Sequence, residues 1–220
     1  MYSEHTMKDI RYFFWDFDGT LFDTYPVIIE TLRQGLREFG HDCDPEEAMK
    51  LMLDTIPTAR NHYADLFCID RDALAEAYRH YRRISVEELL AEPFEGVREV
   101  LEKIRCVGGE NYIYTHRKRS QTLAYLEKHG LDGYFSDVLG EDSPGFAVKP
   151  APDSLLYLME KHGIDPAQAV MIGDRDRDLG SGHAAGMRTA HFVCAVSPEE
   201  LPCDWRFHSF SEMLALLQER

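Results

Sequence analysis

The chain has 220 residues, of which 44% are hydrophobic and 29% charged, which is ordinary for a soluble globular protein with one domain or a core with a smaller insertion. Its 39 acidic and 24 basic side chains give a formal charge of −15, which argues against duplex nucleic acid as a partner. No apolar run approaches the roughly 20 residues of a membrane span, no secretory signal is evident, and widely spaced cysteines favour a reduced, cytoplasmic protein.

The first predicted strand covers residues 11–16, and the pattern then changes to helical spacing. Apolar residues three or four positions apart predict a first helix, with the stripe Ile29, Leu32, Leu36 and Phe39. A second helix is predicted to open at Pro45, and a longer one to cover residues 71–90. Residues 23–92 therefore read as an all-helical insertion.

After Pro93, predicted strands and helices alternate. Strands are predicted at residues 112–115, 135–139, 169–173 and 188–193. Helices are predicted at residues 95–105, 119–129, 152–162 and 178–186, and around Phe210, Met213, Leu214 and Leu217. Helices between successive strands imply right-handed crossovers and a mainly parallel sheet. We predict an α/β fold with a Rossmann-like core, formed by residues 1–22 and 93–220, and the helical domain at 23–92.

Two acids stand where the first strand ends. Residues 13–24 read FFWDFDGTLFDT, so a buried strand runs into Asp16 and Asp18, and Gly19 follows at once. Carboxylates this close repel each other, which favours a bound cation, a shifted pKa, or both. An acidic turn that merely caps the following helix is the alternative.

Two later strand-like runs also end at polar residues. Residues 110–117, ENYIYTHR, form a short strand-like run that ends at Thr115. Residues 169–178, AVMIGDRDRD, end in Gly173 and Asp174, with Asp178 four positions on, and Lys149-Pro150 stands between the two runs. Open α/β sheets gather their chemistry at the carboxyl ends of their strands.

These four motifs, in this order, resemble those of the haloacid dehalogenase superfamily of aspartate-nucleophile hydrolases, over about two thirds of the chain. The resemblance implies that Asp16 is the nucleophile, that Asp18 is the general acid and base, and that the helical insertion is a mobile cap. Thr115 would bind a phosphoryl oxygen, and Lys149 would neutralise charge. Gly19 would let the neighbouring backbone approach the phosphoryl group.

The resemblance also implies a magnesium ion, which prefers hard oxygen ligands. It assigns the ion to the Asp16 carboxylate, the Asp18 backbone carbonyl and Asp174. Asp178 would orient this site, although an acid at that position could equally serve only the helix dipole.

The expected activity is hydrolysis of a small phosphomonoester metabolite through an aspartyl phosphate, by a monomer or homodimer without nucleic-acid or membrane partners. The dehalogenases of the superfamily use neither a second acid of this kind nor a metal, so Asp18 points away from carbon–halogen chemistry. A sugar phosphomutase, which shares the cap and the paired aspartates, is the alternative enzyme. A catalytically idle phosphate-binding module is a further alternative.

Two further substrate contacts are predicted. Phosphatases of this group commonly place Asn after the Thr or Ser, whereas this chain has His116-Arg117. His116 either contacts the substrate or the cap, or is a loop histidine without a role. In the segment at residues 54–63, DTIPTARNHY, Pro and Thr residues predict a turn between two cap helices. Arg60 on that turn would grip a carboxylate or second phosphate, the alternative being an arginine on a solvated helix.

Overall fold

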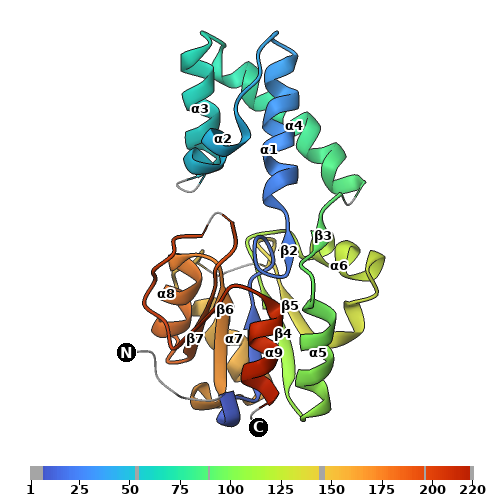
Figure 1. The fold of residues 1–220 in the computed structure, drawn as a ribbon, viewed down its shortest axis with the longest axis vertical. Coiled ribbons are helices and arrows are strands. Elements are labelled where there is room, and N and C mark those ends of the chain that lie inside the picture. Colours follow the sequence, from blue (N-terminus) through green and yellow to red (C-terminus); the bar gives the residue numbers. More distant parts are fainter. Residues whose placement is uncertain (1–6, 53–54, 89, 144–146, 196, 219–220) are drawn as a thin grey trace. The chain divides into compact units, whose positions relative to one another are not determined.

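The structure, a computed structural model, describes residues 7–52, 55–88, 90–143, 147–195 and 197–218. The chain divides into two compact units, one of Met1–Phe22 with Pro93–Arg220 and one of Asp23–Glu92 (Figure 1). It passes between them through two short strands, β2 (Phe22–Asp23) and β3 (Glu92–Pro93), which pair with each other. The second unit is thus an insertion in the first.

The larger unit contains, within the described residues, a parallel sheet of six strands in the order β5-β4-β1-β6-β7-β8. The strands are β1 (Tyr12–Trp15), β4 (Glu110–Tyr114), β5 (Phe135–Leu139), β6 (Ala169–Gly173), β7 (Arg188–Phe192) and β8 (Trp205–Phe207). Phe13, Phe14 and Trp15 are fully buried, as expected for a parallel strand covered on both faces. The predicted α/β fold with a parallel sheet is confirmed.

Helices cover both faces of this sheet (Figure 1). They are α5 (Val97–Cys106), α6 (Arg119–Lys128), α7 (Asp153–His162), α8 (Asp176–Ala184) and α9 (Phe210–Gln218). Phe14 packs in one apolar cluster with Leu155 and Leu158 of α7, whereas the ring of its neighbour Trp15 stacks on Phe210 of α9 at 6.1 Å. Because successive side chains of a strand point to opposite faces, α7 and α9 lie on opposite sides of β1.

The inserted unit consists of four helices in its described part: α1 (Tyr25–Arg37), α2 (Pro45–Met52), α3 (Ile56–Leu66) and α4 (Arg71–Glu87). Ile29, Leu32 and Leu36 of the predicted stripe are buried, and α1 packs on α4. The two helices are in contact at Gly35, where an added Cβ would lie 3.4 Å from the backbone nitrogen of Tyr78. Phe39, which was predicted to extend the stripe, lies beyond the end of α1 and is 38% exposed.

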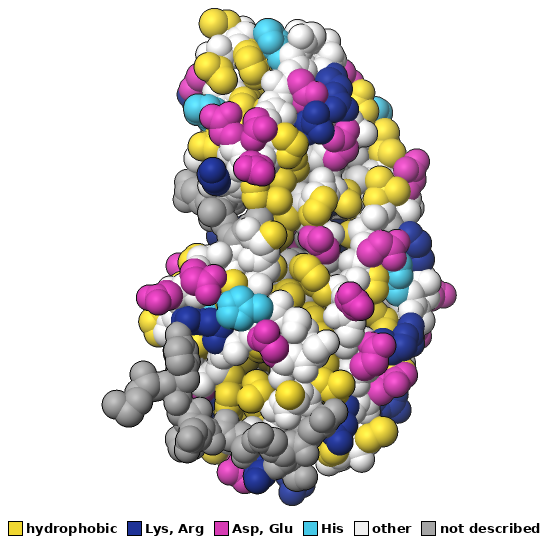
Figure 2. Space-filling model, in the orientation of Figure 1, with side chains coloured by type: hydrophobic (Ala, Val, Ile, Leu, Met, Phe, Trp, Pro, Cys, Tyr) yellow, Lys and Arg dark blue, Asp and Glu magenta, His cyan; other side chains and the backbone are white. Residues whose placement is uncertain are grey.

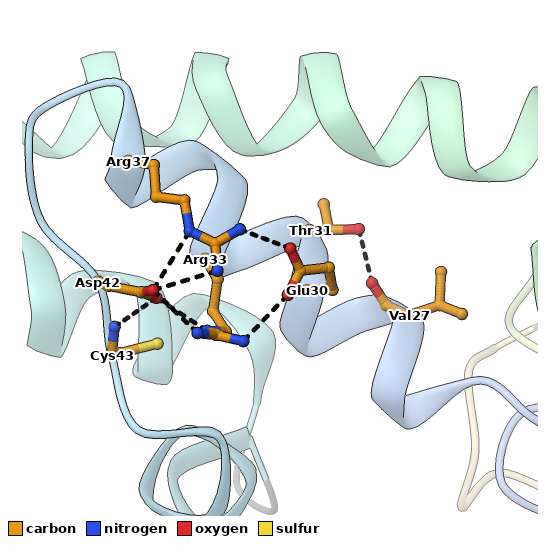
Figure 3. Close-up of polar contacts among 7 residues, drawn as sticks. All are labelled: Val27, Glu30, Thr31, Arg33, Arg37, Asp42 and Cys43. Carbon is orange, nitrogen blue, oxygen red and sulfur yellow. Dashed lines mark hydrogen bonds and ion pairs between the residues drawn. The ribbon is translucent and has the colours of Figure 1, made fainter.

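An ion-pair network ties α1 to the loop that follows it (Figure 3). The Arg33 guanidinium donates to both carboxylate oxygens of Asp42, at 2.8 and 2.9 Å. Arg37 donates to Glu30 at 2.7 Å and to Asp42 at 3.1 Å. The Arg33 hydrogen bonds lower the pKa of Asp42 to about 2. These side chains are partly exposed, so the network shapes the loop more than it stabilises the unit.

The predicted turn at residues 54–63 is wrong. Residue Asp54 lies outside the described residues, but α3 already begins at Ile56 and contains Arg60, Asn61 and His62. Thr55 caps this helix by accepting the N–H of Thr58 at 3.2 Å. Pro57 lies in the first helical turn, where a missing N–H breaks no intrahelical hydrogen bond, so it starts the helix.

Charged side chains of both signs are spread over the face shown in Figure 2, where acidic groups lie beside Lys and Arg on both units. No helix in the described part of the chain has the length and apolar character needed to cross a membrane.

Candidate active site

The predicted site residues of the core follow three neighbouring strands. Trp15 of β1 lies in register with Ile113 of β4 on one side and with Ile172 of β6 on the other. The residues that follow these strands, Asp16, Thr115 and Asp174, therefore emerge together at the carboxyl edge of the sheet. All three are buried, with Asp16 held by its N–H to the Ile172 carbonyl at 2.9 Å.

Lys149 joins this group from a loop more than a hundred residues beyond Asp16. Its Nζ lies 2.6 Å from Asp16 Oδ1 and 2.8 Å from Asp178 Oδ1, and over the ring of Tyr114 at 4.6 Å. Burial alone would lower the pKa of Lys149, but Asp16 and Asp178 outweigh it and raise that pKa. The site thus contains a permanent buried cation.

The acids outnumber this cation. Carboxylate oxygens of Asp16, Asp174 and Asp178 all lie within 4.8 Å of one another, and all three residues are buried. Burial raises the pKa of Asp16 well above its ordinary value, against the pull of Lys149, and the charges of Asp178 and Asp174 raise it further. Buried oxygen donors with excess negative charge fit a hard divalent cation such as Mg²⁺.

Asp178 is held in place on both sides of its carboxylate. Oδ1 faces Lys149, whereas Oδ2 accepts the N–H of Arg175 at 3.1 Å at the start of α8. Its side chain lies across Gly173, where an added Cβ would stand 2.3 Å from the Asp178 Cβ. Glycine at that position therefore makes room for the acid. These contacts suit Asp178 to orienting Lys149 and the acidic cluster.

A tight loop positions Asp18 and Gly19. The Phe17 carbonyl accepts the N–H groups of Leu21 and Phe22 at 3.1 and 3.0 Å, and Gly19 donates its own N–H to the Phe22 carbonyl at 2.8 Å. Gly19 has a φ of 75°, which glycine adopts without the penalty that a side chain would add. The predicted sharp exit after the first strand is present.

The loop after β4 carries two further side chains. Thr115 donates its N–H to the Leu139 carbonyl at 3.0 Å, and its Oγ1 accepts the N–H of Arg117 at 3.1 Å. Arg117 in turn forms an ion pair with the Asp18 carboxylate. Sequence reasoning noted Arg117 only as part of a departure from the usual motif and assigned it no role.

Cys194 was also missed. Its thiol, beyond the end of β7, lies 3.7 Å from Asp174 Oδ2 and 3.1 Å from Ser197 Oγ. A single cysteine in a loop has no spacing pattern that could have indicated this neighbour.

His116 contacts the protein's own backbone. Its Nε2 accepts the N–H of Lys149 at 3.0 Å, which fixes the loop that carries the lysine. Burial lowers the pKa of His116 to about 4, and the positive charge of Lys149 acts in the same direction. The ring is therefore neutral near pH 7 and acts here as a hydrogen-bond acceptor. Its predicted contact with substrate stays a prediction.

The His116 pKa predicts a pH dependence of stability. In the unfolded chain the ring takes up a proton near pH 6.5, whereas in the folded chain it does so only near pH 4. Stability is therefore lost as the pH falls from about 6.5 towards 4. His116→Gln keeps a hydrogen-bond acceptor but cannot take up this proton. In urea unfolding over that pH range, its free energy of unfolding should therefore fall less with decreasing pH than that of the wild type, whereas the exposed His80→Gln should behave like the wild type. Equal slopes for wild type and His116→Gln would contradict the assignment.

Arg60 belongs to the inserted unit and is described only within it. It lies in α3, is half-buried, and its Nε has no hydrogen-bond partner in the described part of the chain. The structure thus assembles Asp16, Asp18, Thr115, Lys149, Asp174 and Asp178 within the core unit, while the role of Arg60 stays a prediction.

Comparison with known proteins agrees with this arrangement. The family model described as haloacid dehalogenase-like hydrolase matches residues 13–192, which include every core residue of the site. The chain belongs to this family. It is a hydrolase of the haloacid dehalogenase type, and the resemblance inferred from its motifs is confirmed.

Relatives align over most of their own length. The phosphoglycolate phosphatase of Haemophilus influenzae is 27% identical over 92% of this chain and 96% of its own. The pyrophosphatase PpaX of Bacillus velezensis is 28% identical over 84% of each. A hydrolase from Streptococcus pneumoniae is 32% identical with a TM-score of 0.68, covering 86% of this chain and 95% of its own.

Proposed function

We propose that this haloacid dehalogenase-like hydrolase is a magnesium-dependent phosphatase that cleaves a small phosphomonoester metabolite through an aspartyl phosphate. The observation that carries the proposal is the contact of Asp16 with Lys149 inside a cluster of buried carboxylates, at the carboxyl ends of adjacent parallel strands. A carboxylate held beside a fixed cation suits attack on an anionic phosphoryl group.

In the first step, an oxygen of Asp16 attacks phosphorus while the bond to the leaving oxygen breaks, and Asp18 gives its carboxyl proton to that oxygen. In the second step, water attacks phosphorus and Asp18 takes a proton from it. Inorganic phosphate departs, and Asp16 is restored as a carboxylate. Lys149 and the Thr115 hydroxyl stabilise the charge on the phosphoryl oxygens in both steps.

Asp16 and Asp174, with the backbone carbonyl of Asp18, would hold the magnesium ion. Asp178 would keep Lys149 and the cluster oriented through its two fixed oxygens. A bound ion supplies positive charge to the phosphoryl oxygens and so lowers the barrier to attack by an anionic nucleophile. The names of the relatives, phosphoglycolate phosphatase and a pyrophosphatase, support a small anionic phosphate compound as substrate.

A panel of phosphorylated metabolites, assayed for phosphate release with Mg²⁺ and with EDTA, tests the proposal. We expect hydrolysis of at least one small phosphomonoester that EDTA abolishes and added Mg²⁺ restores. Isomerisation of a sugar phosphate without net phosphate release would identify a phosphomutase instead. Binding without any turnover would leave only a phosphate-binding module.

Asp18→Asn should slow both steps without preventing phosphate binding. Loss of general acid–base assistance is worth on the order of 10² to 10⁴ in rate. Turnover measured over a pH series should show this loss, with inhibition by inorganic phosphate retained. Unchanged turnover at every pH would remove Asp18 from the mechanism.

Arg60→Ala tests the predicted substrate contact in the inserted unit. If Arg60 binds an anionic group of the true substrate, the variant should raise KM for that substrate roughly tenfold, as expected for loss of a charged hydrogen bond of about 1.5–3 kcal/mol. A small aryl phosphate, which lacks such a group, should be nearly unaffected. The exposed Arg79→Ala on α4 is the matched control. Similar losses on both substrates would rule out a specificity role.

We further propose that the enzyme works in the cytoplasm as a monomer or homodimer. The support is that all five cysteines are free in the structure, as in a reducing compartment.

A further inference from the structure

A buried arginine lies beneath the proposed acid. Arg117 has a side chain that is only 2% exposed, yet it reaches Asp18, whose side chain is 29% exposed, through an ion pair between Nη2 and Oδ1. The partners are 99 positions apart in sequence, and both belong to the core unit. The ion pair therefore links the loop after β1 to the loop after β4.

Two aromatic rings lie against this guanidinium. The Arg117 Cζ lies 5.3 Å from the ring centre of Phe17 and 5.1 Å from that of Tyr125. Its backbone is fixed as well, because its N–H donates to Thr115 Oγ1. An arginine held by two rings and a backbone hydrogen bond has little rotational freedom, so the position of Nη2 is well defined.

Two of the remaining donors of Arg117 make no hydrogen bond within the described residues. Its Nε and Nη1 are buried and have no hydrogen-bond partner among the residues that the structure describes. A purely structural arginine would be expected to satisfy such donors, because unpaired buried polar groups are costly. The Asp18 carboxylate is instead the polar group towards which this side chain is directed.

We propose that Arg117 is a positioning residue that holds the carboxyl group of Asp18 in the orientation needed for proton transfer. The proposal rests on the proposed phosphatase activity and adds a residue to it. In the first step Asp18 is protonated on Oδ2 while Oδ1 accepts the hydrogen bond from Arg117, and the Oδ2 proton goes to the leaving oxygen as the bond from phosphorus to that oxygen breaks. In the second step the same carboxylate takes a proton from the attacking water. Arg117 itself exchanges no proton and does not touch the substrate.

Leaving groups of different basicity distinguish this role from simple stabilisation. An alkyl phosphate needs a proton on its leaving oxygen, whereas an aryl phosphate with an acidic phenol departs with little help. Arg117→Met, which can fill the space between the rings, should therefore lower kcat/KM for the alkyl ester about 10- to 100-fold. It should change kcat/KM for the activated aryl ester much less, because this leaving group needs little help from a proton. The later hydrolysis of the aspartyl phosphate does not affect kcat/KM, which covers only binding and the first chemical step.

Two variants complete the comparison. Arg117→Lys keeps the positive charge without the planar fork and should give an intermediate loss on the alkyl ester. Arg119→Met, two positions on, removes an exposed arginine that donates to the Val138 carbonyl, and should leave both rates unchanged. Thermal unfolding of each variant shows whether it is folded, and Arg117→Lys carries the test if Arg117→Met is not.

A double-mutant cycle tests whether Arg117 acts through Asp18. In the Asp18→Asn background, the substitution at Arg117 should have almost no further effect on the alkyl ester, because it acts through Asp18. Equal losses on both esters, or the same loss with and without Asp18, would overturn the positioning role while leaving the phosphatase activity in place. If the wild type itself releases no phosphate from either ester, the proposed function is overturned as well.

Discussion

Asp16→Asn is expected to lower turnover by roughly 10⁴-fold or more while the protein stays folded. The variant removes the attacking oxygen anion and with it the covalent route, whereas the amide fits the same space. Lys149 keeps its contact with Asp178 at 2.8 Å, so the buried cation remains paired. Phosphate release under saturating substrate, with thermal unfolding as the folding check, measures the effect.

Asp153→Asn is the matched control, because it removes an exposed acid in the first turn of α7. That variant should retain wild-type turnover. A folded Asp16→Asn protein that releases phosphate at a near-normal rate would show that another group attacks phosphorus.

Lys149→Met is expected to have the second largest effect, on stability as well as on activity. It leaves the buried carboxylates of Asp16 and Asp178 without their shared cation, and breaking a buried ion pair from one side costs about 3–5 kcal/mol. Urea unfolding in EDTA should show this loss. Added Mg²⁺ should recover part of it, because the ion binds the folded acidic cluster and offsets the same charge.

Lys161→Met provides the matched comparison. Lys161 also contacts a carboxylate, Asp137, at 2.7 Å, but its side chain is 48% exposed. Its loss should lower the stability far less than the loss of Lys149, because water screens an exposed ion pair. If Lys149→Met unfolds at the same urea concentration as wild type, the contact with Asp16 and Asp178 does not stabilise the fold.

The core strands and their polar ends could be predicted because each signal is local. The apolar run of β6 between Ala169 and Gly173 has the predicted bounds, and β5 does as well. Gly163, with a φ of 65°, ends α7 where a glycine after Lys and His indicates a helix end. Parallel pairing then places the ends of β1, β4 and β6 together without further information.

Other features depend on contacts that no short stretch of sequence encodes. The strand β8 has three residues, and its apolar pattern is too short to distinguish it from a loop. Pro57 by itself predicts a turn, although with the Thr55 cap before it the same residue lies in the first turn of α3. The ion pair of Arg117 with Asp18 joins distant loops, so only the assembled sheet brings its partners together.

The most direct test of the proposed mechanism is to look for the covalent intermediate itself. The wild-type protein with Mg²⁺ and a rapidly cleaved aryl phosphate would be quenched in acid within one turnover, digested, and analysed by mass spectrometry. We expect one added phosphoryl group on the peptide that contains residues 13–24, located on Asp16 and absent from the Asp16→Asn protein. Rapid hydrolysis with no phosphorylated peptide, or a phosphoryl group on another residue, would contradict the account.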